Sequence, residues 1–393
     1  MNREIVVVGY ARTPFGSFQG SLASLSAPKL GAQAIQGALQ RSGVSPDQVS
    51  EVILGQVLTA GSGQAPARQA TLYAGLPQSV AALTINKVCG SGMKSILLGT
   101  QSLLLGDSQV VIAGGMESMS GAPYLLPQAR SGFRMGHQTV LDSMISDGLW
   151  DPYHQSHMGK CAELCAREWK FSREQQDQFA MESFKRAQAA QKAGKWSQEM
   201  IPVEVPGKKG EVQKVESDEG PAKVQFDKIP TLKPAFDQQG TVTAANASTI
   251  NDGACAMVLT TADQARSLKL KPVAKIVSYA THAQAPEWFT TAPAQAMRKA
   301  MAQANWQMKD VDLFEVNEAF AVVALAAQKE LGIDSERLNV WGGAIALGHP
   351  IGASGTRIVM TLISALQDRG LKRGVASICI GGGEATAIAV ERL

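Results

Sequence analysis

Two cysteines and one histidine of this chain lie in short glycine-rich segments, where a side chain is well placed to meet a substrate. Cys89 lies in the segment 86–93, between an apolar, strand-like run and the start of an amphipathic stretch. Such a strand-to-helix corner carries unpaired N–H groups and the positive end of the helix dipole, so we expect it to lower the pKa of the thiol. Because the thiolate is the nucleophilic form of cysteine, Cys89 is a candidate nucleophile.

His349 and Cys379 are the second and third candidates, both near the C-terminus. His349 is held between Gly348 and Pro350, and Cys379 precedes the three glycines 381–383. Glycines at such places let the backbone approach a ligand closely and leave N–H groups free to bind an oxyanion. A lone cysteine is more often a small buried hydrophobe. A thiol, an imidazole and a second thiol, all on glycine-rich turns, nevertheless predict a covalent acyl-transfer enzyme.

A fourth polar group follows another strand-like run. Asn317 and Glu318 come directly after the segment Leu313–Val316 and before an apolar helical pattern. Asparagine and glutamate at this place act either as a helix cap or as a hydrogen-bonding pair in a catalytic site. Both interpretations stay open from the residues alone.

The composition indicates a packed globular protein that is long enough for more than one domain. The chain has 393 residues, of which 45% are hydrophobic and 18% charged, and its net charge is +3. So small a charge gives no reason to expect a nucleic-acid partner. The apolar run at residues 5–8 is too short for a signal peptide, and no run reaches the roughly 18 residues of a membrane helix. We therefore expect no membrane partner.

The cysteine count favours a reducing compartment. Five cysteines, at positions 89, 161, 165, 255 and 379, make an odd number without a secretory signal. Cys161 and Cys165 have no second pair at zinc-site spacing, so we interpret them as one face of a helix and expect no metal. Six lysines between residues 207 and 233 alternate with acidic residues, which is typical of a solvated loop. Cytoplasmic localisation is the resulting expectation.

The chain contains what looks like a duplicated β/α unit. Residues 90–117 give a glycine-rich corner, a helical pattern and an apolar strand, and residues 353–384 repeat that order. The segment 4–11 likewise parallels 274–280. Alternating apolar strands and helical patterns predict an α/β fold with mainly parallel sheets in two pseudo-symmetric halves. In the second unit we expect the strand to run from residue 376 to residue 384.

An insertion interrupts this symmetry. Residues 119–249 are richer in Met, Gln, Lys and Pro and hold one clear helix, which is capped at Ser172 and stops at Gly194. We predict three parts: an N-terminal half of residues 1–118 plus 250–269, an inserted loop or cap domain of residues 119–249, and a C-terminal half of residues 270–393. The insertion is most simply a cap over the site.

The chain resembles the thiolase family over essentially its whole length. The resemblance rests on five segments in order: the block around Cys89, residues 246–254, residues 317–320, residues 342–355 and residues 379–383. It implies the duplicated five-layer α/β fold of thiolases, with a loop domain over the active site. It also implies an acyltransferase that condenses two acetyl-CoA molecules to acetoacetyl-CoA and CoA, and that runs in reverse as thiolysis.

The resemblance assigns a role to each reactive residue. Cys89 takes the acetyl group after His349 has accepted its proton, and Cys379 removes a proton from the methyl carbon of the second acetyl-CoA. His349 and a water held by Asn317 form one oxyanion hole. The backbone N–H groups of Cys89 and Gly381 form the other. No cofactor is implied, since the coenzyme A thioesters are themselves substrates.

Substrate contacts are also implied by the resemblance. The expected substrate- and CoA-binding residues are His157, Met158, Ser248, Ala319, Phe320, Trp288 and Lys223. Where many relatives carry Met-Gly-x-Gly-Pro, this chain has bulkier residues at 286–293, so Trp288 and Phe289 are expected at the acyl pocket or its rim, favouring short acyl groups. Lys223 belongs to the lysine-rich loop near the expected position of the CoA phosphates.

Several alternatives remain open from the sequence. A 3-ketoacyl-CoA thiolase of β-oxidation with broader chain-length range is the main one, and His157 favours the acetoacetyl-specific branch over it. A decarboxylating ketoacyl synthase is disfavoured by Cys379. An inactive CoA-binding relative and a redox role for Cys89 with Cys379 are also conceivable. The family resemblance implies a homo-oligomer, for which we expect a tetramer rather than a dimer.

Overall fold

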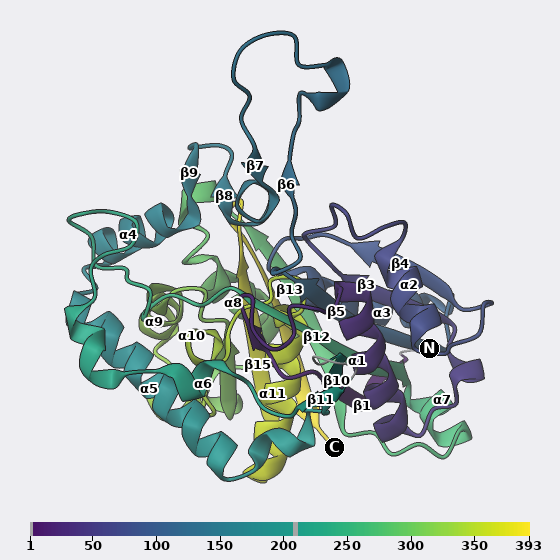
Figure 1. Cartoon of the computed structure of the whole chain (residues 1–393). Helices are drawn as coiled ribbons and strands as arrows, with labels where there is room; N and C mark the ends of the chain where they lie inside the picture. The colour runs from purple at the N-terminus through teal and green to yellow at the C-terminus, as the bar shows by residue number, and fades with distance from the viewer. Residues whose placement is uncertain (1–2, 207–210) are drawn as a thin grey trace.

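The computed structural model describes residues 3–206 and 211–393, and these form two α/β halves joined through one continuous sheet (Figure 1). In the N-terminal half the strand order is β4-β3-β5-β12-β1, and in the C-terminal half it is β13-β16-β15-β14. The N-terminal strands are β1 (Ile5–Arg12), β2 (Gly16–Ser17), β3 (Glu51–Gly55), β4 (Ala81–Ile85), β5 (Val110–Ser118) and β12 (Asn251–Thr261). The C-terminal strands are β13 (Ala274–Ala283), β14 (Leu313–Val316), β15 (Arg373–Ile380) and β16 (Glu384–Arg392).

The strand directions correct the prediction of mainly parallel sheets. Strand β3 runs parallel to β4 and β5, and β14 runs parallel to β15, but the pairs around β1, β12, β13 and β16 are antiparallel. The predicted strand 376–384 is in fact two, because the turn Gly381–Gly383 reverses the chain and Glu384 begins β16. A two-strand hairpin needs no crossover helix, so helix alternation in the sequence did not reveal it.

The register confirms the duplication. Strand β1 pairs with β12 and has a bulge between Val7 and Gly9, and β13 pairs with β16 and has a bulge between Ile276 and Ser278. The two bulges stand at the positions that the sequence comparison matches to one another. The halves meet where residues 5–7 of β1 pair antiparallel with residues 274–276 of β13. The two copies thus contact each other through equivalent strands.

Helices complete five layers. Helices α1 (Ala27–Ser42) and α2 (Pro66–Tyr73) cover the outer face of the N-terminal sheet, and α8 (Ala292–Gln303) and α9 (Ala321–Leu331) cover the outer face of the C-terminal sheet. Helices α3 (Ser91–Leu105) and α11 (Ser354–Asp368) pack against each other between the N-terminal and C-terminal parts of this sheet. The remaining helices of the two halves are α7 (Ala262–Ser267) and α10 (Ala344–Leu347).

Glycines let the two central helices approach closely at their N-terminal ends. A Cβ on Gly92 would lie 2.8 Å from Thr356 Oγ1, and one on Gly355 would lie 2.5 Å from the backbone nitrogen of Met93. The hydroxyl of Thr356 donates to the carbonyl of Gly92 at 2.9 Å. Because Cys89 precedes α3 and His349 precedes α11, this contact brings the two residues toward one place.

The inserted residues do more than cap the site. Their elements are β6 (Tyr124–Leu125), β7 (Leu141–Asp142), β8 (Trp150–Asp151), β9 (Ser156–His157), α4 (Met158–Trp169), α5 (Arg173–Lys192), β10 (Val203–Pro206), β11 (Val212–Val215) and α6 (Gly220–Lys223). Helix α5 begins after the predicted cap Ser172, with both capping-box bonds formed, and packs on α9 and α10. Strand β10 packs with the outer core of the N-terminal half. The segment between β6 and β7 projects from the molecule (Figure 1).

Membrane-spanning helices and metal-binding clusters are both absent from the described residues. Among them no helix is both long enough and apolar enough to cross a membrane. Within the same residues no cluster of three His, Cys, Asp or Glu side chains is arranged to hold a metal ion. Cys161 and Cys165 lie on α4 as predicted, and both are buried. Two lysines of the mixed-charge loop, Lys208 and Lys209, lie outside the described residues.

Candidate active site

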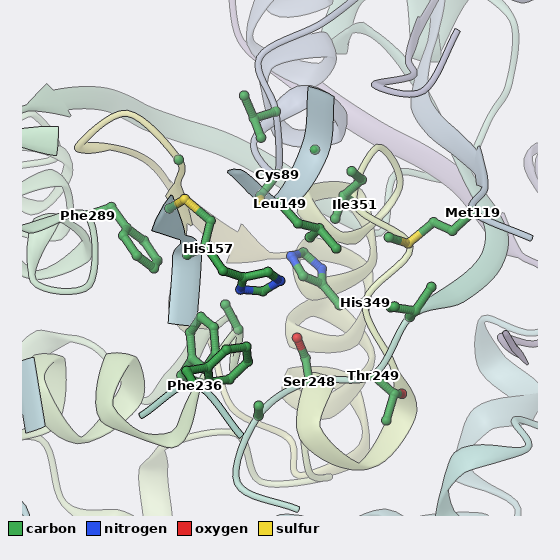
Figure 2. Close-up of a pocket in the computed structure, with 18 residues that line it drawn as sticks. Cys89, Met119, Leu149, His157, Phe236, Ser248, Thr249, Phe289, His349 and Ile351 are labelled. Atoms are coloured by element: carbon green, nitrogen blue, oxygen red, sulfur yellow. The ribbon is translucent and has the colours of Figure 1, made fainter. Parts of the chain in front are cut away.

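A cavity of about 290 Å³ lies where the two halves and the inserted segment meet, and Figure 2 shows the residues that line it. The N-terminal ends of both central helices lie at this cavity, since Cys89 and His349, which precede them, are among the lining residues. The lining residues are Val88, Cys89, Met119, Gly148, Leu149, His157, Met158, Phe236, Ala247, Ser248, Thr249, Ile250, Phe289, Ala319, Phe320, His349, Ile351 and Gly381. Most of these side chains are apolar, so few waters screen a charge that develops inside. The interaction of that charge with nearby polar groups is correspondingly strong.

Cys89 is presented by a strained turn. Val88 has a φ of 45°, a left-handed conformation that a β-branched residue rarely adopts. Local bonds hold the turn: the N–H of Val88 donates to Asn86 Oδ1 at 2.9 Å, and the N–H of Gly90 donates to the Lys87 carbonyl at 3.0 Å. Cys89 follows directly and stands before Gly90, the N-cap of α3. As predicted, the thiol sits at a strand-to-helix corner.

The ionisation of Cys89 differs from the prediction. Burial raises the pKa of the thiol to about 11, although the N–H of Gly381 and the thiol's own backbone N–H oppose the rise. The corner does supply the expected N–H donors, but they stabilise the thiolate less than its desolvation destabilises it. Cys89 is therefore a neutral thiol at pH 7, and its attack requires a base.

His349 has the ionisation and orientation of that base. Burial, with the nearby Arg357 charge as a lesser cause, lowers the pKa of the imidazole to about 3, so it is neutral. The hydroxyl of Ser354 donates to the Pro350 carbonyl at 2.9 Å, and the same oxygen lies 2.6 Å from His349 Nδ1. Nδ1 then carries the proton, and Nε2 keeps a free lone pair. Nε2 has no hydrogen-bond partner within residues 3–206 and 211–393, and the ring lines the cavity.

Asn317 and Glu318 have separate functions. Glu318 is buried and accepts bonds from Ser183 Oγ at 2.7 Å, Asn339 Nδ2 at 2.8 Å and the N–H of Ile345 at 3.1 Å, so it holds the segment that leads to His349. Asn317 is also fully buried, yet both polar atoms of its side chain lack a partner among the described residues. Neither residue caps the helix that follows, because the N-cap of α9 is Phe320 and it has no side-chain bond. Glu318 instead binds the first turn of α10, and Asn317 is free to bind another group.

Cys379 lies near the end of β15, and neither it nor Asn317 is among the residues that line the cavity. It is 1% exposed, and burial raises the pKa of its thiol well above the usual value, with the Cys89 charge as a further cause. The two thiols are therefore close enough to influence each other's ionisation. Gly381 follows two residues later and lines the cavity, and its N–H lowers the pKa of the Cys89 thiol.

Five of the seven predicted substrate-binding residues line the cavity. His157, Met158, Ser248, Ala319 and Phe320 are all in its wall. The N–H of Ser248 donates to the Ala319 carbonyl at 2.9 Å, which joins the inserted segment to the loop before α9. These residues come from distant parts of the chain, and the cavity assembles them as the resemblance implies.

The other two predicted residues lie elsewhere. Trp288 is half-buried outside the wall, whereas its neighbour Phe289 is buried and lines the cavity. Consecutive residues of the short turn point in different directions, and only the fold decides which one faces inward. Lys223 is exposed on α6, where its ammonium donates to Glu219 Oε2 at 2.6 Å and to Ser17 Oγ at 2.8 Å. It is engaged there and contributes nothing to the cavity wall.

Aromatic rings form one side of the cavity. The His157 ring stacks on Phe236 with centroids 4.8 Å apart, and Phe320 meets both Phe236 and Phe289 edge to face. In Figure 2 the labelled Phe236 and Phe289 lie on one side of His349, and Met119 and Ile351 lie on the other. Phe236 was not predicted, since a single phenylalanine in a polar loop carries no signal in the sequence.

Glu117 is a second residue that sequence reasoning missed. It is fully buried near the end of β5 and accepts N–H bonds from Val57 at 3.0 Å, Leu58 at 3.1 Å and Gly352 at 2.9 Å. Burial raises its pKa to about 7, and these N–H groups oppose the rise. Glu117 fixes the loop of Ile351 against the N-terminal half. The feature of the sequence that could have identified Glu117 is a carboxylate near the end of an apolar strand.

Comparison with known proteins agrees with this geometry. The family model described as "Thiolase, N-terminal domain" matches residues 5–263, and "Thiolase, C-terminal domain" matches residues 270–392. The chain is 53% identical over 390 residues to the acetyl-CoA acetyltransferase of Cupriavidus necator, covering 99% of each chain. It is also 53% identical over 393 residues to acetyl-CoA acetyltransferase 2 of Arabidopsis thaliana, covering 100% of this chain and 98% of that protein.

A solved structure extends the likeness to the fold. The crystal structure of the Bacillus anthracis acetyl-CoA acetyltransferase superposes with a TM-score of 0.97 at 39% identity and covers 100% of both chains. The likeness thus includes both halves and the inserted segment, and it agrees with a cavity built from Cys89, His349 and the end of β15. The chain belongs to the thiolase family.

Proposed function

We propose that this thiolase is an acetyl-CoA C-acetyltransferase, which condenses two acetyl-CoA molecules to acetoacetyl-CoA and CoA and catalyses thiolysis in reverse. The observation that carries the proposal is the convergence of the Cys89 thiol, the unpartnered Nε2 of His349 and the N–H of Gly381 on one apolar cavity. The similarity to acetyl-CoA acetyltransferases over the whole chain supports the same reaction.

The first half-reaction transfers an acetyl group to Cys89. His349 Nε2 accepts the thiol proton as the sulfur attacks the thioester carbonyl, and the oxyanion that forms is bound by the N–H groups of Cys89 and Gly381. The carbon–sulfur bond to CoA then breaks, and the CoA thiolate takes the proton of Cys379, which leaves Cys379 as a thiolate and His349 as an imidazolium. Free CoA and acetyl-Cys89 result.

The second half-reaction forms the carbon–carbon bond. Cys379, as its thiolate, removes a proton from the methyl carbon of a second acetyl-CoA, and the carbanion attacks the acetyl-Cys89 carbonyl. The sulfur of Cys89 leaves and recovers its proton from His349. The enolate oxygen is bound by Asn317, acting through a water, and by His349. The proton that Nε2 accepted from Cys89 in the first half-reaction makes Nε2 the donor in this step. This chemistry uses coenzyme A thioesters as substrates and no further cofactor.

The aromatic wall supports a short acyl group. Phe236, Phe289 and Phe320, with His157, occupy one side of the cavity beside the reacting residues. An acetyl or acetoacetyl group fits against this wall, whereas a long acyl chain requires the rings to move apart at a cost in packing. This favours acetoacetyl-CoA over the long-chain substrates of the broader-chain alternative.

Thiolysis of acetoacetyl-CoA and of an eight-carbon 3-ketoacyl-CoA tests the function. The wild type is expected to prefer acetoacetyl-CoA strongly, Cys89→Ala to be inactive on both, and Phe289→Ala to gain relative activity on the longer substrate. Comparable wild-type rates on both substrates would assign the enzyme to β-oxidation. Activity that survives in Cys89→Ala would overturn the mechanism.

We also propose a homotetramer that works in the cytoplasm as part of lipid metabolism. The projecting residues 124–142, which include β6 and β7, carry apolar side chains in solvent, with Tyr124 68% and Met135 95% exposed, which is typical of a surface covered by another subunit. The five free cysteines suit a reducing compartment. Light scattering is expected to give the mass of four chains of 41.6 kDa, and a monomer mass would contradict the tetramer.

A further inference from the structure

An ion pair bridges the two turns that supply the oxyanion donors of Cys89 and Gly381. The ammonium of Lys87 binds the carboxylate of Glu384, across 297 positions of sequence. Lys87 stands two residues before Cys89, and Glu384 stands three residues after Gly381. The two side chains are 23% and 33% exposed, so the pair is only partly screened by solvent.

The bonds within each turn set its shape but do not set the distance between the turns. On the Cys89 side, the N–H of Lys87 donates to Ser91 Oγ at 2.8 Å, and this hydroxyl donates to the Val88 carbonyl at 2.6 Å. These bonds are local, and Val88 beside them is strained at a φ of 45°. A strained conformation persists only where surrounding contacts enforce it.

The opposite turn is intrinsically permissive. Gly382 and Gly383 have φ values of 90° and 85°, which glycine adopts readily. The N–H of Gln284 donates to the Gly383 carbonyl at 2.9 Å, which ties this turn to its own half but not to the Cys89 turn. Glu384 follows these glycines directly, and its ion pair with Lys87 of the other half restricts their conformation. The charged group next to this pair is Lys94 on α3, whose pKa is lowered by burial and by Lys87. The Lys94 ammonium is thus a second positive charge near Glu384, and its interaction with this carboxylate is weaker than that of Lys87.

We propose that Lys87 and Glu384 are positioning residues, whose ion pair fixes the separation of the Cys89 and Gly381 N–H groups at the value that binds the tetrahedral oxyanion. The proposal rests on the acetyl-transfer function proposed above. The pair touches neither substrate nor reacting atoms, and it acts by holding two backbone donors in register across the halves. Donors of this kind stabilise a transition state only when they are held at hydrogen-bond distance from the developing charge.

The predicted consequence is confined to the steps at the acyl carbonyl, and two exchange reactions separate these steps from enolate formation. Isotope exchange between acetyl-CoA and CoA reports acetyl transfer to Cys89, which uses this oxyanion hole. Exchange of the methyl hydrogens of acetyl-CoA with deuterated water reports enolate formation, which uses His349 and Asn317. In Lys87→Met and in Glu384→Gln we expect kcat for acetyl-CoA/CoA exchange to fall about 10-fold and KM to stay nearly unchanged. Removing an oxyanion donor outright typically lowers kcat more, by roughly 100-fold.

Two further measurements distinguish positioning from general support. The charge swap Lys87→Glu with Glu384→Lys is expected to exceed both single variants in acetyl-CoA/CoA exchange, because the pair is restored. Methyl-hydrogen exchange in the same variants is the second measurement. It is expected to stay near the wild-type rate, which would show that the variants fold and that the oxyanion hole of His349 and Asn317 is intact.

Lys195→Met is the matched control. Lys195, on the short helix Lys195–Gln198, binds Asp368 in a pair with 33% and 21% exposed side chains, away from the cavity wall. Its loss is expected to leave both exchanges unchanged. Exchange in Lys87→Met within twofold of wild type, equal losses in both exchanges, or a charge swap no better than the single variants would overturn the proposal. A wild type without acetyl-CoA/CoA exchange would overturn the proposed function itself.

Discussion

Burial controls the protonation of the three reactive side chains. It raises the pKa values of Cys89 and Cys379 and lowers that of His349, so each group is neutral in the resting enzyme. A neutral thiol beside a neutral imidazole transfers its proton only when it attacks a substrate. This differs from a preformed thiolate–imidazolium pair, and the difference is measurable through the reactivity of Cys89.

Alkylation of Cys89 by iodoacetamide is therefore expected to accelerate with pH. With a pKa of about 11, the thiolate fraction rises about tenfold per pH unit between pH 7 and 9. The rate constant, followed at Cys89 by mass spectrometry, should rise in the same proportion. A rate that is flat from pH 6 upward would instead indicate a thiolate already stabilised by a protonated His349.

Asn317 is the second residue with a specific prediction. Both polar atoms of its amide are buried and unpartnered among the described residues, so Asn317→Ala removes a donor without breaking a structural bond. We expect kcat of condensation to fall by about 100-fold or more, and the unfolding temperature to change little. Methyl-hydrogen exchange of acetyl-CoA should fall with it, whereas acetyl-CoA/CoA exchange should not. The reverse pattern would place Asn317 in the other oxyanion hole.

At the scale of elements, close backbone approach brings the reactive residues together. Gly92 and Gly355 let α3 and α11 meet, and Gly348 lets the turn before His349 pass the side chain of Asn251. The N–H of His349 donates to Asn251 Oδ1 at 3.1 Å and to the Thr249 carbonyl at 3.2 Å. The imidazole is thus aimed by strand β12 and by the residues that precede it.

Gly348→Ala is expected to damage both stability and catalysis. Gly348 has a φ of 105°, and an added Cβ would collide with the Asn251 amide. We expect a loss of more than about 2 kcal/mol in the free energy of unfolding and at least a tenfold fall in kcat.

Gly370→Ala provides the control, because Gly370 has a φ of 66° and no atom within 4 Å of the added Cβ. It should lose only about 1 kcal/mol through backbone strain and keep full activity. Chemical denaturation and steady-state thiolysis measure both variants. Equal effects of the two substitutions would show that backbone conformation alone, and not the contact with Asn251, explains the loss at Gly348.

At the scale of the whole molecule, buried charges tie the inserted segment to the core. Arg12 of β1 is fully buried and donates to Glu199 Oε1 at 2.6 Å and to both oxygens of Asp218, at 2.7 and 2.8 Å. Both acidic residues belong to the inserted segment. The insertion is thereby integral to the N-terminal half, and the cavity wall it supplies is held in place.

Arg12→Met should destabilise the entire protein. The substitution leaves two carboxylates buried without their cation, which typically costs about 3 to 5 kcal/mol. Arg266→Met removes an exposed pair with Asp263, whose side chains are 74% and 83% exposed, and should cost almost nothing. Thermal unfolding compares the two. A similar melting temperature for both variants would show that the Arg12 cluster contributes no net stability.

The sequence by itself determined the reactive residues, the duplication and the family. Cys89, His349 and Cys379 were identified from their glycine-rich turns, the helix after Ser172 from its capping box, and the two halves from repeated strand and helix patterns. These features are local: spacing, turn chemistry and periodicity are written in neighbouring residues. The division into residues 1–118 with 250–269, 119–249 and 270–393 stays a prediction.

Only the tertiary structure decided what depends on distant neighbours. Burial reversed the expected pKa shift of Cys89, and a hairpin at residues 381–383 replaced one predicted strand by two. The fold turned Phe289 into the cavity in place of Trp288 and engaged Lys223 on the surface. Desolvation, strand direction and side-chain orientation are set by what packs against a residue, and those partners lie hundreds of positions away in the chain.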